Sequence, residues 1–425
     1  MHHSITETAV NTLPGAFPGT SGESPSGSAR SVATSQTGSL GITAKSSTPP
    51  DREIGMREAR AEKYSALSRA RLWIGRRVNM MFPDVQFPGD KFRTFDCRYV
   101  RRSHFVSVHL NREFKQASYR GIATCGSVWA CPVCAGKIQE RRRLELEHLV
   151  NWAQLEGLQA LMVTLTFPHT SFDTLADLLE RQALAFKLFR SGSPYVRLKK
   201  SIGFRGLVRS LEVTHGASGW HPHTHELWLV SPTAGPGLRQ RLLELWERAC
   251  IAAGLLDPAD QAKLYGFRQH SVDVKFNASS GDYLAKQDSS RNWGITHEVA
   301  KASSKAGKAK GVHPHEFLVR AAKGDEARYF EYLDAMKGRR QLFWSPGLKA
   351  ACGIDDLDDQ TVAELVDDKA DLLGNLVETE WEFIRSKRAV ARVLDAAEIG
   401  GWPLVMRYMK RLGYRERPPN EFPSP

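Results

Sequence analysis

Apolar and polar positions alternate along two neighbouring stretches in the middle of the chain. Residues 204–214 alternate with a period of two, and a second alternating stretch covers about residues 220–230. This period places successive side chains on opposite faces of a β-strand. Because only the glycine-containing turn 215–219 separates the two stretches, they are predicted to pair as an antiparallel hairpin.

Other patterns place this hairpin in a larger sheet. The β-rich apolar run 158–167, closed by Pro168, predicts a central strand. The remaining predicted elements are helices over about 137–156, 173–190, 236–254 and 278–287, and a strand over about 265–276. From residue 158 onward the order β-α-β-β-α-β-α matches a ferredoxin-like, split-βαβ layout. We therefore predict an α+β fold whose central antiparallel sheet carries the hairpin.

Composition changes toward both ends of the chain. Residues 1–50 are rich in Ser, Thr, Gly and Pro without apolar periodicity, which is typical of a disordered tail. The basic helical spacing over 52–82 predicts a helix that either contacts nucleic acid or presents a solvated face. The remaining predicted segments are a basic helical segment 51–90, a Cys-rich segment with a basic helix 91–156, a core 157–290, a basic loop-rich extension 291–350 and a helical C-terminal region 351–425.

Bulk composition narrows the class of protein. The chain has 425 residues, of which 41% are hydrophobic and 25% charged, as in globular proteins. No apolar run approaches the ~18 residues of a membrane span, and the polar N-terminus lacks a signal-peptide core. We therefore expect a cytoplasmic protein without a membrane partner. The net charge of +12 favours an anionic partner, nucleic acid first, although many soluble proteins are mildly basic.

Three histidines recur at every second position in the segment Gly-Trp-His-Pro-His-Thr-His. His221, His223 and His225 would share one face of a strand, and Leu227 and Leu229 would continue that face into the core. Neutral imidazoles held a few ångströms apart can bind a divalent metal. The alternative is a structural histidine pair.

A carboxylate on the preceding strand would complete such a site. Glu212 lies eleven residues before His223, and an antiparallel hairpin can bring it to the histidine face. Two imidazoles and one carboxylate leave positions for water and a phosphate oxygen, which suits Mg²⁺ or Mn²⁺ in phosphoryl transfer. Otherwise Glu212 is a surface strand residue. His221, one step further out, is a third ligand, a phosphate contact or an exposed side chain.

A candidate nucleophile lies downstream. Tyr283 and Lys286 are spaced i and i+3, so they would share one helix face. A phenol with a pKa near 10 attacks poorly unless a cation favours its phenolate. Lys286 would supply that cation or bind DNA phosphate. The alternative is a half-buried tyrosine beside a solvated lysine.

Cysteines cluster in a second place. Three of the six cysteines lie within ten residues, and with Cys97 they would form a structural zinc site of four thiolates: Cys97, Cys125, Cys131 and Cys134. His104 or His109 could replace one thiolate, and the alternative is a set of reduced cysteines packed under the sheet. His313 and His315 repeat a His-Pro-His pattern without a flanking apolar strand, and we interpret them as loop residues.

Basic residues near these features are candidates for DNA contact. A zinc site at the cysteines would present the three consecutive arginines that follow them in the charged helix. The candidate DNA-binding residues are Arg141, Arg142, Arg143, Lys301, Lys305, Arg339 and Arg340.

The order of the motifs resembles that of a known superfamily. A Thr-Leu-Thr strand within 163–167 precedes the Trp-His-Pro-His-Thr-His strand, and a Tyr-x-x-Lys motif follows. In this order the chain resembles the HUH endonucleases, specifically the rolling-circle plasmid replication initiators. The likeness includes the cysteine segment 125–134 and the segment 337–349, and it covers roughly residues 90–350.

The resemblance implies roles for individual residues. His223 and His225 match the paired metal ligands, and Glu212 matches a third ligand. Tyr283 matches the nucleophile that attacks a phosphodiester at the replication origin, leaving a 5′-phosphotyrosine and a free 3′-OH that primes synthesis. Lys286 matches a lysine that positions the tyrosine or stabilises charge. The implied partner is origin DNA, single-stranded at the nick; contacts with host helicase and polymerase stay open.

Two departures leave alternatives. Thr224 stands between the paired histidines where the superfamily typically has a bulky apolar residue. Ser279 stands four residues before the tyrosine, where some initiators carry the glutamate that ends replication, and Asp282 would point roughly 100° away from the tyrosine on a helix. How replication would end stays open, with another second nucleophile or water held by Asp282 as the alternatives. The alternative functions are a single-tyrosine transposase, a relaxase-like enzyme, or a non-catalytic zinc-ribbon DNA-binding protein.

Overall fold

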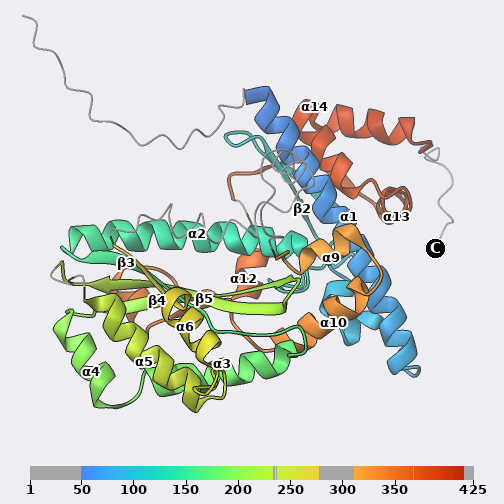
Figure 1. Cartoon of the computed structure of the whole chain (residues 1–425). Coiled ribbons are helices and arrows are strands. Elements are labelled where there is room, and N and C mark those ends of the chain that lie inside the picture. The colour runs from blue at the N-terminus through green and yellow to red at the C-terminus, as the bar shows by residue number, and fades with distance from the viewer. Residues whose placement is uncertain (1–48, 233–234, 236, 277–310, 367, 416–425) are drawn as a thin grey trace, which may run out of the picture. The chain divides into compact units, whose positions relative to one another are not determined.

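The computed structural model describes residues 49–232, 235, 237–276, 311–366 and 368–415 (Figure 1). Several predictions made above lie outside these ranges. They are the disordered tail up to residue 48, the helix over 278–287, and the residues Ser279, Asp282, Tyr283, Lys286, Lys301 and Lys305. Among the helices that are described, none combines the length and apolar character needed to span a bilayer.

The N-terminal part contains one long helix, a small sheet and a second long helix. Its elements are α1 (Pro49–Met81), η1 (Pro88–Asp90), η2 (Arg93–Phe95), β1 (Val106–Asn111), β2 (Gln116–Arg120) and α2 (Pro132–Leu155). The middle part contains β3 (Gln159–Leu165), α3 (Leu175–Phe189), α4 (Gly192–Ser201), β4 (Gly206–Gly216), β5 (Gly219–Val230), α5 (Leu238–Ala252), α6 (Gln261–His270) and β6 (Val272–Lys275).

The described C-terminal part is mostly helical but adds one strand to each of two sheets. Its elements are α9 (His315–Arg320), α10 (Asp325–Met336), β7 (Leu342–Trp344), α11 (Leu348–Ala351), α12 (Asp359–Glu364), β8 (Asp371–Leu376), α13 (Glu378–Ser386) and α14 (Val390–Arg411).

The larger sheet has five strands in the order β6-β3-β5-β4-β7, and every neighbouring pair is antiparallel. Helix α2 covers one face, where Leu149 packs with Leu227 and Leu229. Helices α3 and α5 cover the other face, where Trp246 packs with Trp228 (Figure 1). Successive apolar residues along each hairpin strand pack into different core clusters, one on each face of the sheet. The predicted alternation of the hairpin is therefore confirmed.

The hairpin turn is tightly constrained. Strands β4 and β5 pair from Gly206 opposite Leu229 to Gly216 opposite Gly219, as predicted from their alternation. Gly219 has φ +85°, and a Cβ placed there would lie 2.9 Å from the Cα of Ser171. A larger residue would therefore be both strained and crowded at this position.

A second, three-stranded sheet was not predicted. Its order is β2-β1-β8, and β1 pairs antiparallel with both neighbours. Trp381 and Val393 of the C-terminal helices pack with Val108 of β1 in a separate core cluster. Segment 91–156 was expected to be Cys-rich with a basic helix, and segment 351–425 was expected to be helical. The two segments instead share one sheet.

Two further sequence predictions are wrong. The strand expected over 265–276 begins only at Val272, because α6 occupies most of the range; Asp260 caps α6, and Leu264 and Phe267 are buried at helical spacing. The described part of the extension 291–350, expected to be loop-rich, forms α9, α10, β7 and the start of α11.

Helix α1 confirms the helix predicted over 52–82, but many of its arginines bind within the protein. Arg71 donates to the carbonyl oxygens of Phe95 and Cys97 at 2.7 and 2.8 Å. Arg60 forms an ion pair with Asp395 at 3.1 Å, and Arg76 and Arg77 form ion pairs with residues of α10. Several basic side chains of α1 therefore attach this helix to the rest of the protein.

Candidate active site

One carboxylate and two imidazoles meet on the central hairpin. Glu212 of β4 lies directly opposite His223 of β5 in the strand register. Its Oε2 atom is 3.1 Å from Nε2 of His223 and 3.3 Å from Nε2 of His225. The side chains of all three are 13% exposed or less. The hairpin thus brings the three predicted ligands together at one point.

The spacing of these atoms fits a shared cation. Two ligand atoms at right angles, each about 2.1 Å from an ion, lie about 3 Å apart. The three candidate ligand atoms all lie within 4.8 Å of one another. Nitrogen and carboxylate oxygen together suit a borderline divalent ion such as Mn²⁺ as well as Mg²⁺. Three protein ligands would leave coordination positions for water and substrate.

A threonine of the neighbouring strand orients one imidazole. Thr164 of β3 lies opposite His225 in the register, and its Oγ1 is 3.1 Å from Nδ1 of His225. With Nδ1 engaged by the hydroxyl, Nε2 is the nitrogen that faces Glu212. Metal-binding histidines commonly use such a partner to fix ring orientation. In the sequence this threonine stands out only as part of the Thr-Leu-Thr motif, which indicates no role for it.

His221 belongs to a different pair. Its Nδ1 is 2.7 Å from Nε2 of His169, and Nδ1 of His169 is 3.0 Å from the carbonyl oxygen of Ser218. Burial, with the nearby His223 and His169, lowers the pKa of His221 to about 4. His221 stands outside the three-residue group, although its ring centroid is 4.8 Å from that of His223.

His169 was not among the residues predicted from the sequence. It follows Pro168, directly beyond the predicted central strand, and burial lowers its pKa. Its position at a strand end in line with the histidine strand was the one available signal. The structure shows that His169 fixes the orientation of His221 rather than joining the carboxylate.

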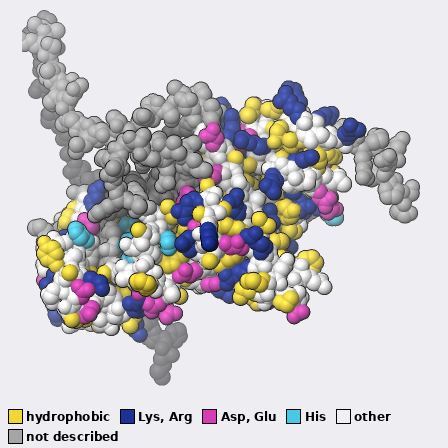
Figure 2. All heavy atoms as spheres, turned by 45° about the vertical axis from the view of Figure 1, so that its right-hand side comes forward, with side chains coloured by type: hydrophobic (Ala, Val, Ile, Leu, Met, Phe, Trp, Pro, Cys, Tyr) yellow, Lys and Arg dark blue, Asp and Glu magenta, His cyan; other side chains and the backbone are white. Residues whose placement is uncertain are grey.

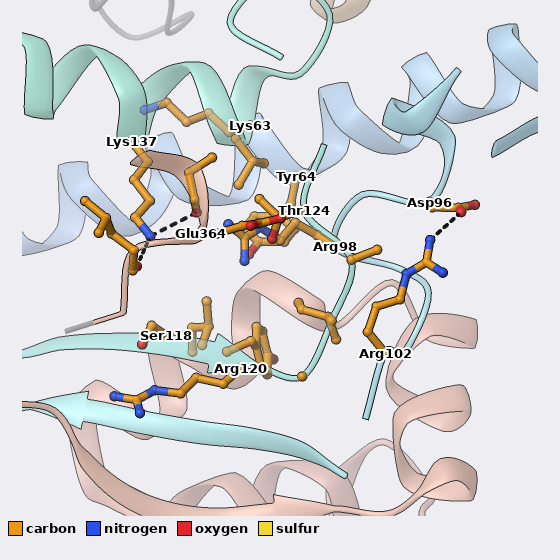
Figure 3. A pocket seen from close by; sticks show the side chains of 18 of the residues that line it. Lys63, Tyr64, Asp96, Arg98, Arg102, Ser118, Arg120, Thr124, Lys137 and Glu364 are labelled. Carbon is orange, nitrogen blue, oxygen red and sulfur yellow. Dashed lines mark hydrogen bonds and ion pairs between the residues drawn. The ribbon is translucent and has the colours of Figure 1, made fainter. Parts of the chain in front are cut away.

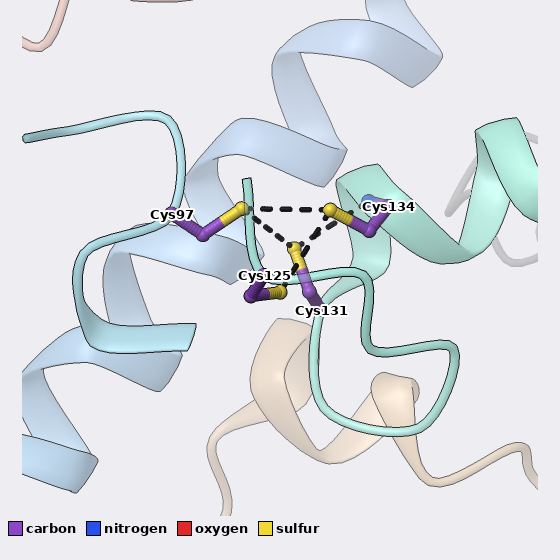
Figure 4. A group of neighbouring side chains, drawn as sticks. All are labelled: Cys97, Cys125, Cys131 and Cys134. Atoms are coloured by element: carbon purple, nitrogen blue, oxygen red, sulfur yellow. Dashed lines mark hydrogen bonds between the residues drawn. The ribbon is translucent and has the colours of Figure 1, made fainter. Parts of the chain in front are cut away.

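The four cysteines predicted to form one site also lie together (Figure 4). The sulfur of Cys97 is 3.5 Å from that of Cys134 and 3.7 Å from that of Cys131, and Cys125 is 3.7 Å from Cys134. Four sulfurs at about 2.3 Å from a tetrahedral zinc ion would be about 3.8 Å apart, whereas a disulfide requires about 2.05 Å. The cluster therefore has the dimensions of a structural metal site.

Local backbone structure supports this cluster. Cys131 caps the N-terminus of α2, and its sulfur accepts a hydrogen bond from the backbone nitrogen of Cys134 at 3.4 Å. Burial raises the pKa of the Cys131 thiol well above its ordinary value. A divalent cation would favour the thiolates that burial alone disfavours. Neither His104 nor His109 belongs to the group, so the histidine alternatives are wrong.

The arginines after the cysteines have contacts within the protein. Arg142 is 8% exposed and reaches both carboxylate oxygens of Glu145 at 2.9 Å, and Asp359 at 3.0 Å. This buried network joins α2 to α12, so the assignment of Arg142 to DNA is wrong. Arg143 pairs with two glutamates of its own helix, while Arg141 lies 3.5 Å from Glu145.

Three other residues of the sequence predictions differ in their surroundings. Arg339 donates to the carbonyl oxygen of Ala335 and accepts, through its own carbonyl, a hydrogen bond from Trp129; Arg340 is exposed. His315 begins α9, is 1% exposed and contacts the carbonyl oxygen of Trp129 at 2.7 Å. The interpretation of His315 as a loop residue is therefore wrong.

Part of this chain is similar to known proteins. Residues 119–250 match the family model described as replication protein. This part of the chain is similar to replication proteins. The matched part begins in β2, ends in α5, and includes Glu212 and the histidine strand, whereas Cys97 and Tyr283 lie outside it.

Two relatives extend the match. The chain is 26% identical over 352 residues to "Protein rep" from Streptomyces lividans, covering 65% of this chain and 76% of that protein. It is 35% identical over 136 residues to "Neomycin resistance protein" from Streptomyces cyanogenus, covering 26% of this chain and 31% of that protein. No solved structure matches the chain. The predicted resemblance to plasmid replication initiators is confirmed.

Proposed function

We propose that this replication protein nicks origin DNA and transfers the strand to a tyrosine, which starts rolling-circle plasmid replication. The observation that carries the proposal is the position of the Glu212 carboxylate, 3.1 and 3.3 Å from the imidazoles of His223 and His225. These residues would hold Mg²⁺ or Mn²⁺. Such an ion would polarise the scissile phosphodiester and offset its charge.

The fold supports this assignment. Among β3, β4, β5 and β6, taken in chain order as strands one to four, the sheet order is four-one-three-two. We assign these strands to the split-βαβ core of an HUH endonuclease, with residues 157–290 as its extent. The chain leaves β6 beside β3, the strand that carries Thr164. Tyr283 follows β6 by eight residues.

The chain's own residues would perform the chemistry in defined roles. The phenol oxygen of Tyr283 attacks phosphorus, the bond between phosphorus and the 3′ oxygen breaks, and that oxygen leaves as a 3′-OH after taking up a proton. Lys286 would stabilise the phenolate before attack. Thr164 keeps His225 in the orientation that presents Nε2 to Glu212. The released 3′-OH is the primer that a host polymerase would extend, after a host helicase opens the duplex.

Charge on the surface agrees with a DNA substrate. Figure 2 shows Lys and Arg side chains on the same face of the molecule as visible histidine side chains. The exposed Arg340, with Arg141, Lys301 and Lys305, would bind phosphates, and such contacts supply most of the affinity without reading sequence. Arg339 and Arg143 would contribute less because their side chains are already engaged.

The cysteine cluster would have a structural role. We propose that Cys97, Cys125, Cys131 and Cys134 bind Zn²⁺. All four are buried, and four thiolates close the coordination shell, so this ion would not contact substrate. It would join the loop that carries Cys97 to the start of α2.

Incubation of the protein with single-stranded origin DNA and Mn²⁺, followed by denaturing electrophoresis, tests the function. We expect a covalent protein–DNA product that is absent from Tyr283→Phe. Tyr265→Phe is the matched control, because Tyr265 is an exposed tyrosine of α6, 70% accessible to solvent. If Tyr283→Phe forms as much adduct as the wild type, Tyr283 is not the nucleophile. A protein that binds origin DNA but never cleaves it would favour the non-catalytic zinc-ribbon alternative.

A further inference from the structure

A large cavity lies beside the cysteine cluster, apart from the histidine site. Figure 3 shows residues that line it. It has a volume of about 1060 Å³, which is ample for a nucleotide. Its walls come from α1, the loops around η1 and η2, strand β2, the first turns of α2 and the end of α12. The proposed nicking mechanism uses none of these residues.

The lining of this cavity is rich in cations. Seven Lys and Arg side chains line it, against three carboxylates, Asp90, Asp96 and Glu364. Arg60 pairs with Asp395 at 3.1 Å, and Arg102 with Asp96 at 3.1 Å. The remaining basic residues of the lining are Lys63, Arg93, Arg98, Arg120 and Lys137. Positive charge therefore exceeds negative charge in the cavity.

Arg98 is the most informative of these residues. Its Nε atom is buried without a hydrogen-bond partner, although a buried guanidinium nitrogen normally has one. Its backbone has φ +54°, a left-handed conformation that costs a non-glycine residue of the order of 1 kcal/mol. The backbone nitrogen of Arg98 donates to the carbonyl oxygen of Ala123 at 2.8 Å, which holds it in this place. The protein thus keeps a strained backbone and an unsatisfied donor at one wall of the cavity.

Lys137 shows how crowded these charges are. Its Nζ donates to the carbonyl oxygens of Ala363, at 3.0 Å, and Leu365. Burial, together with the charge of Arg98, lowers its pKa to about 8. An anion in the cavity would relieve this repulsion.

We propose that this cavity binds a phosphate group through Arg98, Arg120 and Lys63. The phosphate belongs either to the backbone of the DNA or to a free nucleotide, and the DNA source rests on the proposed function. The cysteine cluster would fix the site, because Arg98 directly follows Cys97 and the lining residue Thr124 directly precedes Cys125.

Binding is measured without added Mg²⁺ or Mn²⁺, so that cleavage does not interfere. Binding of a fluorescent single-stranded oligonucleotide is measured by fluorescence anisotropy, and binding of dATP is measured by calorimetry. We expect Arg98→Gln and Arg120→Gln each to bind one probe about tenfold more weakly than the wild type. If the phosphate belongs to DNA, the salt dependence of oligonucleotide binding falls by about 0.7 per lost contact. If it belongs to a free nucleotide, dATP binding alone weakens.

Arg197→Gln is the matched control, since it removes the same charge from an exposed position on α4. Arg120→Gln, at the end of a strand, keeps the test valid if Arg98→Gln unfolds. Wild-type affinity for both probes in both cavity variants would overturn the proposal. DNA cleavage is scored separately: a protein that never cleaves DNA, yet loses affinity in the cavity variants, contradicts the proposed function and supports the cavity.

Discussion

The histidine hairpin and the cysteine cluster each gather candidate metal ligands, but they differ in chemistry and construction. The hairpin combines two neutral imidazoles with one carboxylate, drawn from two adjacent strands within fourteen residues, 212–225. The cluster combines four buried sulfurs, with Cys97 and Cys134 37 residues apart. Three mixed ligands leave room for substrate, whereas four thiolates leave none. The hairpin is therefore suited to chemistry, and the cysteine cluster is suited to holding segments of the chain together.

The largest expected effect is on stability, at the cysteine cluster. Cys134→Ser should lower the free energy of unfolding by about 4 kcal/mol or more and abolish bound zinc, because loss of a structural metal is among the most costly changes. Urea unfolding and elemental analysis measure the two quantities. Cys352→Ser is the control, since Cys352 is buried outside the cluster. Equal losses in the two variants would show that the cluster is ordinary core.

At the hairpin the effect should fall on cleavage instead. His223→Ala should cleave single-stranded origin DNA about 10³-fold more slowly, because a metal ion contributes several kcal/mol to such reactions. Its unfolding midpoint and its affinity for duplex DNA should change little, since phosphate contacts dominate that affinity. The exposed His104→Ala serves as control. Undiminished cleavage by His223→Ala would show that His223 is not a metal ligand.

A smaller effect should come from the orienting threonine. Thr164→Val keeps the shape of the side chain but loses the hydroxyl 3.1 Å from Nδ1 of His225. Loss of such a partner typically weakens metal binding 10- to 100-fold. The Mn²⁺ concentration at half-maximal cleavage should rise by about tenfold, with the maximal rate nearly kept. An unchanged Mn²⁺ requirement would mean that the strand alone orients His225.

The smallest effect is a pH dependence at a buried histidine that belongs to neither group of candidate ligands. Burial lowers the pKa of His315 well below its ordinary value, and His313 lowers it further. Its neutral form is therefore favoured by folding, so stability is full above about pH 6.5 and declines as pH falls below that value. Urea unfolding at pH 7.5 and pH 5 should differ by about 1–2 kcal/mol more in the wild type than in His315→Gln. Identical differences in the two proteins would contradict a buried neutral imidazole.

Local patterns were enough to predict the hairpin and the grouping of its candidate ligands. Glu212, His223 and His225 lie close in sequence, and the period-two rule fixes which side chains share a face. The match of Cys97 with the later cysteines was predicted from cysteine spacing and count. These features depend on short-range geometry or on residue type.

Long-range pairing limited the rest. Strand β8 joins β1 across a separation of more than 260 residues, for example Leu110 with Asp371, and nothing local signals that partner. His169 contacts His221 across 52 residues, so its role was equally hidden. The error at α6 was different, because the cap at Asp260 was present in the sequence but overlooked. Arg142 was misassigned because burial of an arginine depends on partners from α12.

Mass-spectrometric mapping of the residue joined to DNA tests the central claim most directly. The protein is incubated with an origin oligonucleotide in Mn²⁺ or in EDTA, alongside Glu212→Gln, and digested. The proposed mechanism predicts a 5′-phosphorylated nucleotide on Tyr283, formed with Mn²⁺, absent in EDTA and strongly reduced in Glu212→Gln. A DNA link at another residue, or equal linkage in EDTA, would contradict it.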